Sequence, residues 1–213
     1  MSVSTLQRFT VPLEAGQTSA TQGLLMPKLQ YRFRVSFQGF GSSPATDTME
    51  LTKQVRDFTR PQIDFDDITL DVYNSKIRMA GRHTWSDITI TLLDDQSGRV
   101  SRQVGEQLQK QFDFFEQASA ASGADYKFTT VCQMLDGGNG QNEPSIVEQW
   151  EMYGCFIQNA NYNTVAYNTS EPVTISLTLR FDNAIQIASG EELEGGVGNS
   201  TTRPDPTTGT ATV

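Results

Sequence analysis

Alternation of apolar and polar residues dominates the chain between about residues 28 and 183. In LQYRFRVSF, residues 29–37, every second side chain is apolar, and VTISLTLRF, residues 173–181, repeats the pattern. The same alternation recurs, with varying strength, in five further segments: 49–58, 67–73, 87–93, 127–134 and 146–157. A period of two is typical of strands with one buried and one solvated face, as in antiparallel sheets. The sequence therefore predicts a mainly β fold.

One segment follows a helical period instead. From Ser97 to Ala118 the apolar residues recur at spacings of four and three, which forms one stripe of an amphipathic helix. The stripe consists of Val100, Val104, Leu108, Phe112 and Phe115. Asp95 or Ser97 is suited to cap its start, and Gly123 lies just past its end. One helix among about seven or eight strands predicts an antiparallel β-sandwich or barrel, with the helix flanking an open edge or mouth.

The ends of the chain lack this periodicity. We expect an N-terminal extension over residues 1–27, a β-domain over 28–183 and a Gly-, Thr- and Pro-rich C-terminal extension over 184–213. From Asp182 onward, five acids accompany Arg203 as the only base. Such a composition is typical of a segment that does not fold in isolation.

Charge and composition narrow the function classes. The formal net charge is -9 and 37% of the residues are hydrophobic, which fits a soluble globular chain. No apolar run approaches the roughly 18 residues of a membrane span, and the start of the chain does not match a signal peptide, so neither membrane anchoring nor secretion is expected. The acidic balance argues against wrapping nucleic acid, because phosphate contacts need clustered bases. It leaves open a surface past which nucleic acid slides.

Catalytic and metal-binding signals are weak. His83 is the only histidine, so a zinc site or a histidine-based triad would depend on one residue. Cys132 and Cys155 lie in apolar segments and are expected as buried thiols, with a single disulfide left open. The acidic runs at 64–67 and 136–143 lack the spacing of calcium loops. We therefore expect no cofactor, no metal and no enzyme activity.

The most unusual segment is NSKIRMAGRHTW, residues 74–85, between the expected strands 63–73 and 84–95. It carries three bases and no acid, and it is longer than the two to five residues that usually connect a hairpin. The preceding strand holds four acids: Asp64, Asp66, Asp67 and Asp71. Solvated surface is one interpretation. The other is a repeating assembly, in which the basic arm of one copy contacts the acidic rim of the next and builds rings or filaments.

The run YNSKIRMAGRHTWSDITITLLDD resembles the tail tube proteins of contractile-tailed bacteriophages. The matching positions are Asn74, Lys76, Ile77, Ala80, Gly81, Thr84, Trp85, Asp87, Thr89, Thr91, Asp94 and Asp95. The following helix, a strand ending in Tyr153-Gly154-Cys155-Phe156 and a final strand 172–182 agree in order. The chain departs from the family at Ile157, where a proline is common, and after Arg180, where an aromatic-rich ending is common.

The resemblance implies hexameric rings that stack into a hollow tube inside a contractile sheath, with a long hairpin arm docking on the adjacent ring. It also implies contacts with the tail sheath, baseplate and tail terminator proteins, and DNA that passes through the lumen without specific binding. The virion tail would be its location, with assembly in the host cytoplasm. The expected inter-ring arm contacts are Asn74, Lys76, Ile77, Arg78, Met79, Gly81, Arg82 and His83. The acidic acceptor or lumen candidates are Asp64, Asp66, Asp67, Asp71 and Asp87, with Thr89 and Thr91 as further lumen candidates.

Two other functions remain open at this point. A type VI-like or extracellular contractile injection system would use the same fold for a tube that carries effectors. A monomeric carbohydrate-binding β-sandwich would share the strand pattern without the assembly.

Overall fold

A computed structural model describes residues 27–41, 51–137 and 144–188 of the chain. The chain divides into two compact units, Met1–Arg32 and Phe33–Val213, and every described strand and helix belongs to the second. Most of both expected extensions, and residues 138–143 of the acidic run at 136–143, lie outside the described residues. Their roles stay predictions.

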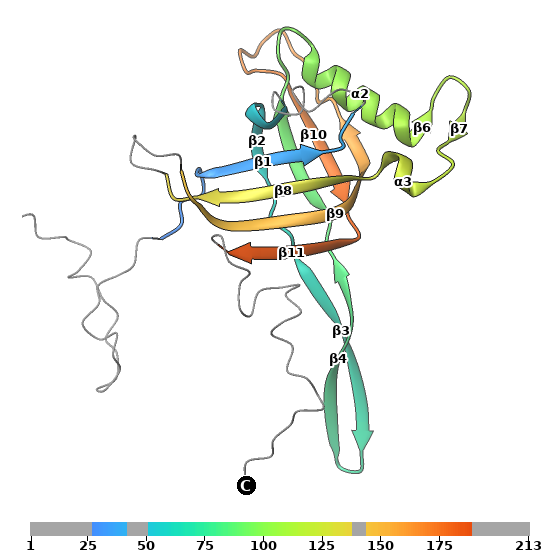
Figure 1. The fold of residues 1–213 in the computed structure, drawn as a ribbon. Helices are drawn as coiled ribbons and strands as arrows, with labels where there is room; N and C mark the ends of the chain where they lie inside the picture. Colours follow the sequence, from blue (N-terminus) through green and yellow to red (C-terminus); the bar gives the residue numbers. More distant parts are fainter. Residues whose placement is uncertain (1–26, 42–50, 138–143, 189–213) are drawn as a thin grey trace, which may run out of the picture. The chain divides into compact units, whose positions relative to one another are not determined.

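The described strands form antiparallel sheets (Figure 1). One seven-stranded sheet has the order β1-β8-β9-β10-β5-β2, and β11 pairs with β9 outside this path. The bounds are β1 (Phe33–Gln38), β2 (Val55–Phe58), β5 (Ile88–Leu93), β8 (Phe128–Leu135), β9 (Ile146–Asn161), β10 (Thr174–Arg180) and β11 (Asn183–Ala188). The mainly β, antiparallel prediction is confirmed. The barrel alternative is wrong, because the path of these described strands stays open.

The long strand β9 belongs to two layers of this sheet (Figure 1). Its first part pairs with β8 and β11, and its last part, from Phe156 onward, pairs with β10. Gly154 lies between these parts with φ +69°, and a Cβ there would lie 2.2 Å from Oδ2 of Asp182. The left-handed backbone favours glycine, and a larger residue would also displace the exposed Asp182 side chain. β11 also carries the sheet on to Ala188, into the segment expected as the C-terminal extension.

The core confirms the strongest alternating segments. Ile88, Ile90 and Leu92 of β5 are fully buried, and the residues that pair with them on β10 are buried as well. The pattern at residues 29–37 holds only in its second half. Val35 and Phe37 are buried, whereas Tyr31 is 72% exposed because residues 30 and 31 form a turn before β1 begins.

The expected helix is shorter than its apolar stripe. α2 spans Arg99–Gln111, with Val100 and Val104 buried. The N-cap is Gly98 and not Asp95 or Ser97 as predicted, although the Asp95 carboxylate accepts the Arg99 N–H at 2.9 Å from ahead of the cap. Beyond Gln111 the helix prediction is wrong. Residues 112–119 form the short strands β6 (Phe112–Asp113) and β7 (Ala118–Ser119), and a four-residue helix α3 follows at Gly123–Tyr126. No helix in the described ranges is long and apolar enough to cross a membrane.

Asp113 explains where the helix ends. Its carboxylate accepts the backbone N–H groups of Phe115 at 2.9 Å and Glu116 at 3.2 Å. These bonds hold the pKa of Asp113 below its usual value and favour a turn over a further helical turn. Phe115 is consequently 95% exposed instead of continuing the buried stripe.

Glutamine side chains of α2 bind the backbone of neighbouring segments. Gln107 is fully buried, accepts the Gly41 N–H at 2.9 Å and donates to the Tyr126 carbonyl at 2.7 Å. Gln111 both donates to and accepts from the backbone of Ile157, each at 2.9 Å. These bonds satisfy backbone groups that no strand partner reaches. They agree with the prediction that the helix covers an open edge.

A buried carboxylate joins three segments of the fold. Oε1 of Glu148 on β9 accepts hydrogen bonds from Arg60 at 2.6 Å, Trp150 at 2.7 Å and Gln186 at 2.9 Å. Arg60 follows β2 and Gln186 lies on β11. Arg60 thus compensates the charge of Glu148, and Trp150 and Gln186 stabilise the carboxylate by hydrogen bonds.

Cys132 and Cys155 are free and buried, so the prediction of buried thiols is confirmed. Burial raises the pKa of both thiols, that of Cys132 to about 12. A group with a raised pKa stays protonated up to that pH, and the protonated thiol is a poor nucleophile.

We expect neither thiol to react with Ellman's reagent at pH 8 while the protein is folded. Burial keeps the reagent out, and it keeps both thiols in their protonated, unreactive form. Adding denaturant should release both thiols at once. The measurement is the absorbance released with time, in native buffer and in guanidinium chloride. Rapid release of one equivalent from the native protein would contradict the buried environment.

Candidate assembly surface

The segment 74–85 is a strand and not a connecting loop. β3 (Ile63–Val72) and β4 (Ser75–Trp85) pair along their whole length and form a two-stranded sheet of their own (Figure 1). Only Tyr73, with φ 49°, and Asn74 connect them. The long hairpin is thus confirmed, and the expectation of a long connecting segment is wrong. We call β3, the turn and β4 the arm.

The register sorts the outer part of the arm into two faces, because directly paired residues share a face and neighbours along a strand alternate. Ile68 pairs with Met79, and Leu70 pairs with Ile77. Together with Val72 these residues form the apolar face, on which each side chain is between 45% and 49% exposed. Residues 67–73 therefore do not bury their apolar face in the chain's own core. The prediction that this strand has one buried face is wrong for the single chain.

The opposite face of the arm carries charges that are matched within the hairpin. Asp71 pairs with Lys76, whose Nζ lies 3.5 Å from the carboxylate, and Arg78 lies 3.4 Å from Asp67. Two of the predicted contact bases thus face two of the predicted acceptor acids on the same copy. The roles of these four residues between copies stay predictions.

Gly81 occupies a β-bulge near the middle of the arm. Phe65 pairs with His83 and Asp67 with Ala80, so two residues of β4 oppose Asp66 alone. A Cβ on Gly81 would lie 3.1 Å from both Cβ and the carbonyl oxygen of Asp66. A larger side chain at position 81 therefore conflicts with the bulge that sets the register of the outer arm.

We expect Gly81→Val to impair self-assembly while leaving the body of the protein folded, because the clash lies within the arm. Sedimentation should show loss of large species, and the thermal midpoint should change by only a few degrees. Gly105→Ala is the matched control, since a Cβ at Gly105 meets nothing within 4 Å. Assembly of the Gly81→Val protein at the level of the unaltered chain would show that the bulge is dispensable.

Aromatic rings connect the base of the arm to the body. The ring of Trp85 lies 5.5 Å from Phe181, and His83 packs edge-on to Trp85 at 6.2 Å. Phe65 continues the row at 6.2 Å from His83. His83 is thus a packing residue, and among the described residues no group of three metal-ligating side chains gathers around it or elsewhere.

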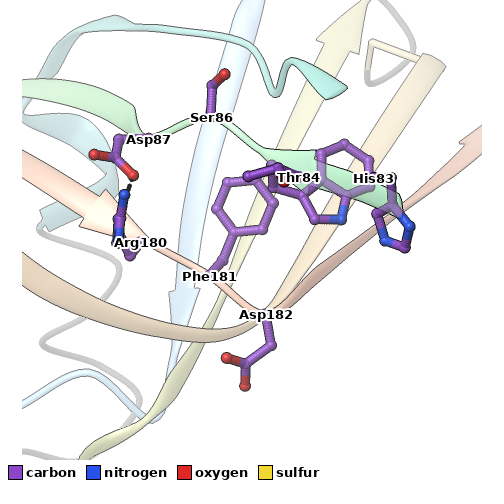
Figure 2. Close-up of a pocket in the computed structure, with 8 residues that line it drawn as sticks. His83, Thr84, Ser86, Asp87, Arg180, Phe181 and Asp182 are labelled. Carbon is purple, nitrogen blue, oxygen red and sulfur yellow. Dashed lines mark hydrogen bonds and ion pairs between the residues drawn. The ribbon is translucent and has the colours of Figure 1, made fainter. Parts of the chain in front are cut away.

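A pocket of about 240 Å³ lies beside this base, lined by residues 83–87 and 180–182 (Figure 2). It contains His83, Ser86 and Asp87, the residue types of a catalytic triad. Figure 2 shows that they point in different directions. The Asp87 carboxylate accepts from Arg180 at 2.6 Å, and Ser86 donates to Asp64 at 3.2 Å. The three residues are therefore not arranged for nucleophilic catalysis.

The lumen candidates Thr89 and Thr91 belong to a mostly uncharged face of the sheet. They pair with Thr178 and Ser176 of β10, which in turn pair with amides of β9. The face consists of Thr89, Thr91, Ser176, Thr178, Asn159 and Asn161. Asp57 and the Asp87–Arg180 pair lie at its margins. Asp71 lies apart from it, on the arm.

Comparison with known proteins shows the fold alone. No protein-family model matches the chain, and no curated protein matches it. Among solved structures, a chain of the anti-feeding prophage tube terminating cap matches with a TM-score of 0.58 and 14% identity over 82% of this chain and 99% of that chain. A chain of the anti-feeding prophage baseplate matches with a TM-score of 0.56 and 11% identity, over 78% and 98%.

A chain of the sheath–tube complex of PVC, an extracellular contractile injection system, matches with a TM-score of 0.52 and 16% identity, over 76% of this chain and 92% of that chain. The protein thus shares its fold with chains of the anti-feeding prophage baseplate and tube terminating cap and of the PVC sheath–tube complex. The resemblance to tail tube proteins is confirmed at the level of the fold.

Proposed function

We propose that this chain is a structural virion protein, the major subunit of the inner tube of a contractile phage tail. The observation that carries the proposal is the arm, whose apolar face has no cover within the described chain, on a fold shared with tube and cap components. In the proposal, hexameric rings stack through the arms, and the hollow stack conducts DNA. Contacts by Asn74, Arg82 and His83 would add to those of the apolar face.

The partners and location follow from the same proposal. The similar solved chains come from structures named for a baseplate, a sheath–tube complex and a tube terminating cap. These names support contacts with a sheath, a baseplate and a terminator, in a virion tail assembled in the host cytoplasm. The chain would need no cofactor and catalyse no reaction.

We further propose that the hydroxyl and amide face around Thr89 and Thr91 lines the lumen. Its side chains are neutral, and the charges of Asp87 and Arg180 compensate one another at its margin. A lining without clustered bases offers phosphate no counter-charge, so DNA passes without specific binding.

An extracellular or type VI-like contractile injection system is the second candidate. One of the matched structures is named as such a system, which favours a tube that conducts effectors in place of DNA. The neutral lining is compatible with either cargo. Neighbouring capsid and terminase genes would favour the phage tail, and neighbouring secretion genes the injection system.

Imaging and sedimentation of the purified full chain test the proposal. We expect a species of about six times the 23.6 kDa chain mass, and hollow tubes of stacked rings in negative stain at higher concentration. A chain that remains a 23.6 kDa monomer at high concentration would overturn the proposal and favour a monomeric binding module.

A further inference from the structure

A second exposed apolar surface lies at the end of the sheet away from the arm. Residues 162–173, here called the β9–β10 loop, connect β9 to β10. Tyr167 is fully exposed in it, Val165 is 73% exposed, and Tyr162 and Val173 are each 44% exposed. Outside the arm, few described segments expose so many large apolar side chains together.

Hydrogen bonds anchor both ends of this loop. The Asn163 amide donates to the carbonyl and hydroxyl of Thr174, at 2.9 and 2.8 Å. The loop is also bound to the end of β5, since the Asp94 N–H donates to the Val173 carbonyl at 3.0 Å. Both ends of the loop, next to Tyr162 and at Val173, are thus fixed to the sheet.

The strand register places the loop and the arm at opposite ends of the same strands. Ile88, the third residue after the arm, pairs with Leu179, whereas Leu93 at the other end of β5 pairs with Thr174, just after the loop. The six residues of β5 separate the two ends by about 17 Å along the strand. In Figure 1 the arm and the connection between β9 and β10 accordingly leave the sheet in opposite directions.

We propose that the apolar face of the arm of one copy packs on the β9–β10 loop of the next copy. The inference rests on the proposed tube function and names the acceptor surface. Neither side offers a cluster of unmatched charges, because the arm pairs Lys76 and Arg78 with its own acids and the loop carries Glu171 as its only charge. Apolar burial, and not ion pairing, then drives the contact.

The arm and the β9–β10 loop are different surfaces at opposite ends of one chain, so their contact is head-to-tail. After every addition, an unbound arm remains at one end of the assembly and an unbound loop at the other. Such a contact extends without limit along one direction, as a stack of rings requires. The occupant of the arm's apolar face is therefore a second copy of this chain.

The test combines two assembly-deficient variants of the full chain. The arm variant carries Ile77→Ser and Met79→Ser, and the loop variant carries Val165→Ser and Tyr167→Ser. Each alone should stop at the unstacked unit, because one half of every contact is missing. When the two are mixed, the intact loops of the arm variant should bind the intact arms of the loop variant. This single contact should give a species of twice the unstacked mass, and longer stacks should not form.

Asn168→Ser is the matched control within the loop and should stack like the unaltered chain. Circular dichroism and thermal unfolding should report an unchanged fold for all variants, since the replaced side chains are exposed. Long stacks from the loop variant, or no doubled species in the mixture, would overturn this inference alone. Failure of the unaltered chain to stack would overturn the proposed function as well.

Discussion

Replacing Ile77 and Met79 by serine should convert stacked assemblies into unstacked units while leaving the fold intact. Each of these side chains is about half exposed in the single chain, and burying that half is worth about 1 kcal/mol per side chain. Six copies per ring would multiply the loss to roughly 12 kcal/mol per interface between rings. Sedimentation velocity of the purified variant measures the effect directly.

Arg78→Gln is the matched control on the other face of the same hairpin. Its ion pair with Asp67 is exposed, and exposed pairs contribute little to stability. We therefore expect this variant to stack nearly as well as the unaltered chain. If Arg78→Gln abolished stacking and the double serine variant did not, charge would hold the copies together, as the interpretation of a basic arm on an acidic rim requires.

The second large effect is expected at Glu148. Replacement by alanine removes the acceptor of three donors and leaves Arg60 without its short ion pair, beside a cavity in the core. Arg60 is 54% exposed, so water solvates it after the change, and the loss comes mainly from the buried hydrogen bonds and packing of Glu148, about 2 kcal/mol. With a slope of about 2 kcal/mol per molar urea, the unfolding midpoint should fall by about 1 M.

Urea unfolding followed by tryptophan fluorescence measures this change, and Trp150 itself donates to Glu148. Asp71→Asn is the control, because the Asp71–Lys76 pair is exposed on the arm and its loss should leave the midpoint unchanged. Equal midpoints for the two variants would show that Glu148 does not brace the fold.

The sequence predicted the body of the fold where alternation and burial coincide. Residues 87–93 and 173–181 alternate because one face of each strand packs in the chain's own core. Residues 67–73 alternate just as regularly, yet Ile68, Leu70 and Val72 remain about half exposed. Alternation reports that a face is suited to burial. It does not distinguish burial within one chain from burial against another copy.

The hydrophobic pattern also did not predict where α2 ends. Phe112 and Phe115 continue the apolar stripe, but backbone hydrogen bonds to the Asp113 side chain end the helix before them. Gln107 and Gln111 were missed because polar residues on the buried side of a helix carry no signal in a hydrophobic pattern. Their partners, Gly41, Tyr126 and Ile157, are distant in sequence.

The sequence singled out the segment of the candidate surface, and the contacts of its residues between copies stay predictions. The basic segment 74–85 was open to two interpretations, solvated surface or an arm that contacts the acidic rim of another copy. The register shows that Lys76 and Arg78 already meet Asp71 and Asp67 on the same hairpin. Pairing of this kind depends on where the hairpin turns. A two-residue turn at Tyr73 and Asn74 is not evident from composition.

A cryo-electron microscopy reconstruction of the assembled full chain tests the central claim most directly. The account predicts stacked hexameric rings in which the apolar face of each β3–β4 hairpin is covered by the next ring. A reconstruction in which the rings touch through other surfaces, with Ile77 and Met79 left in solvent, would contradict it.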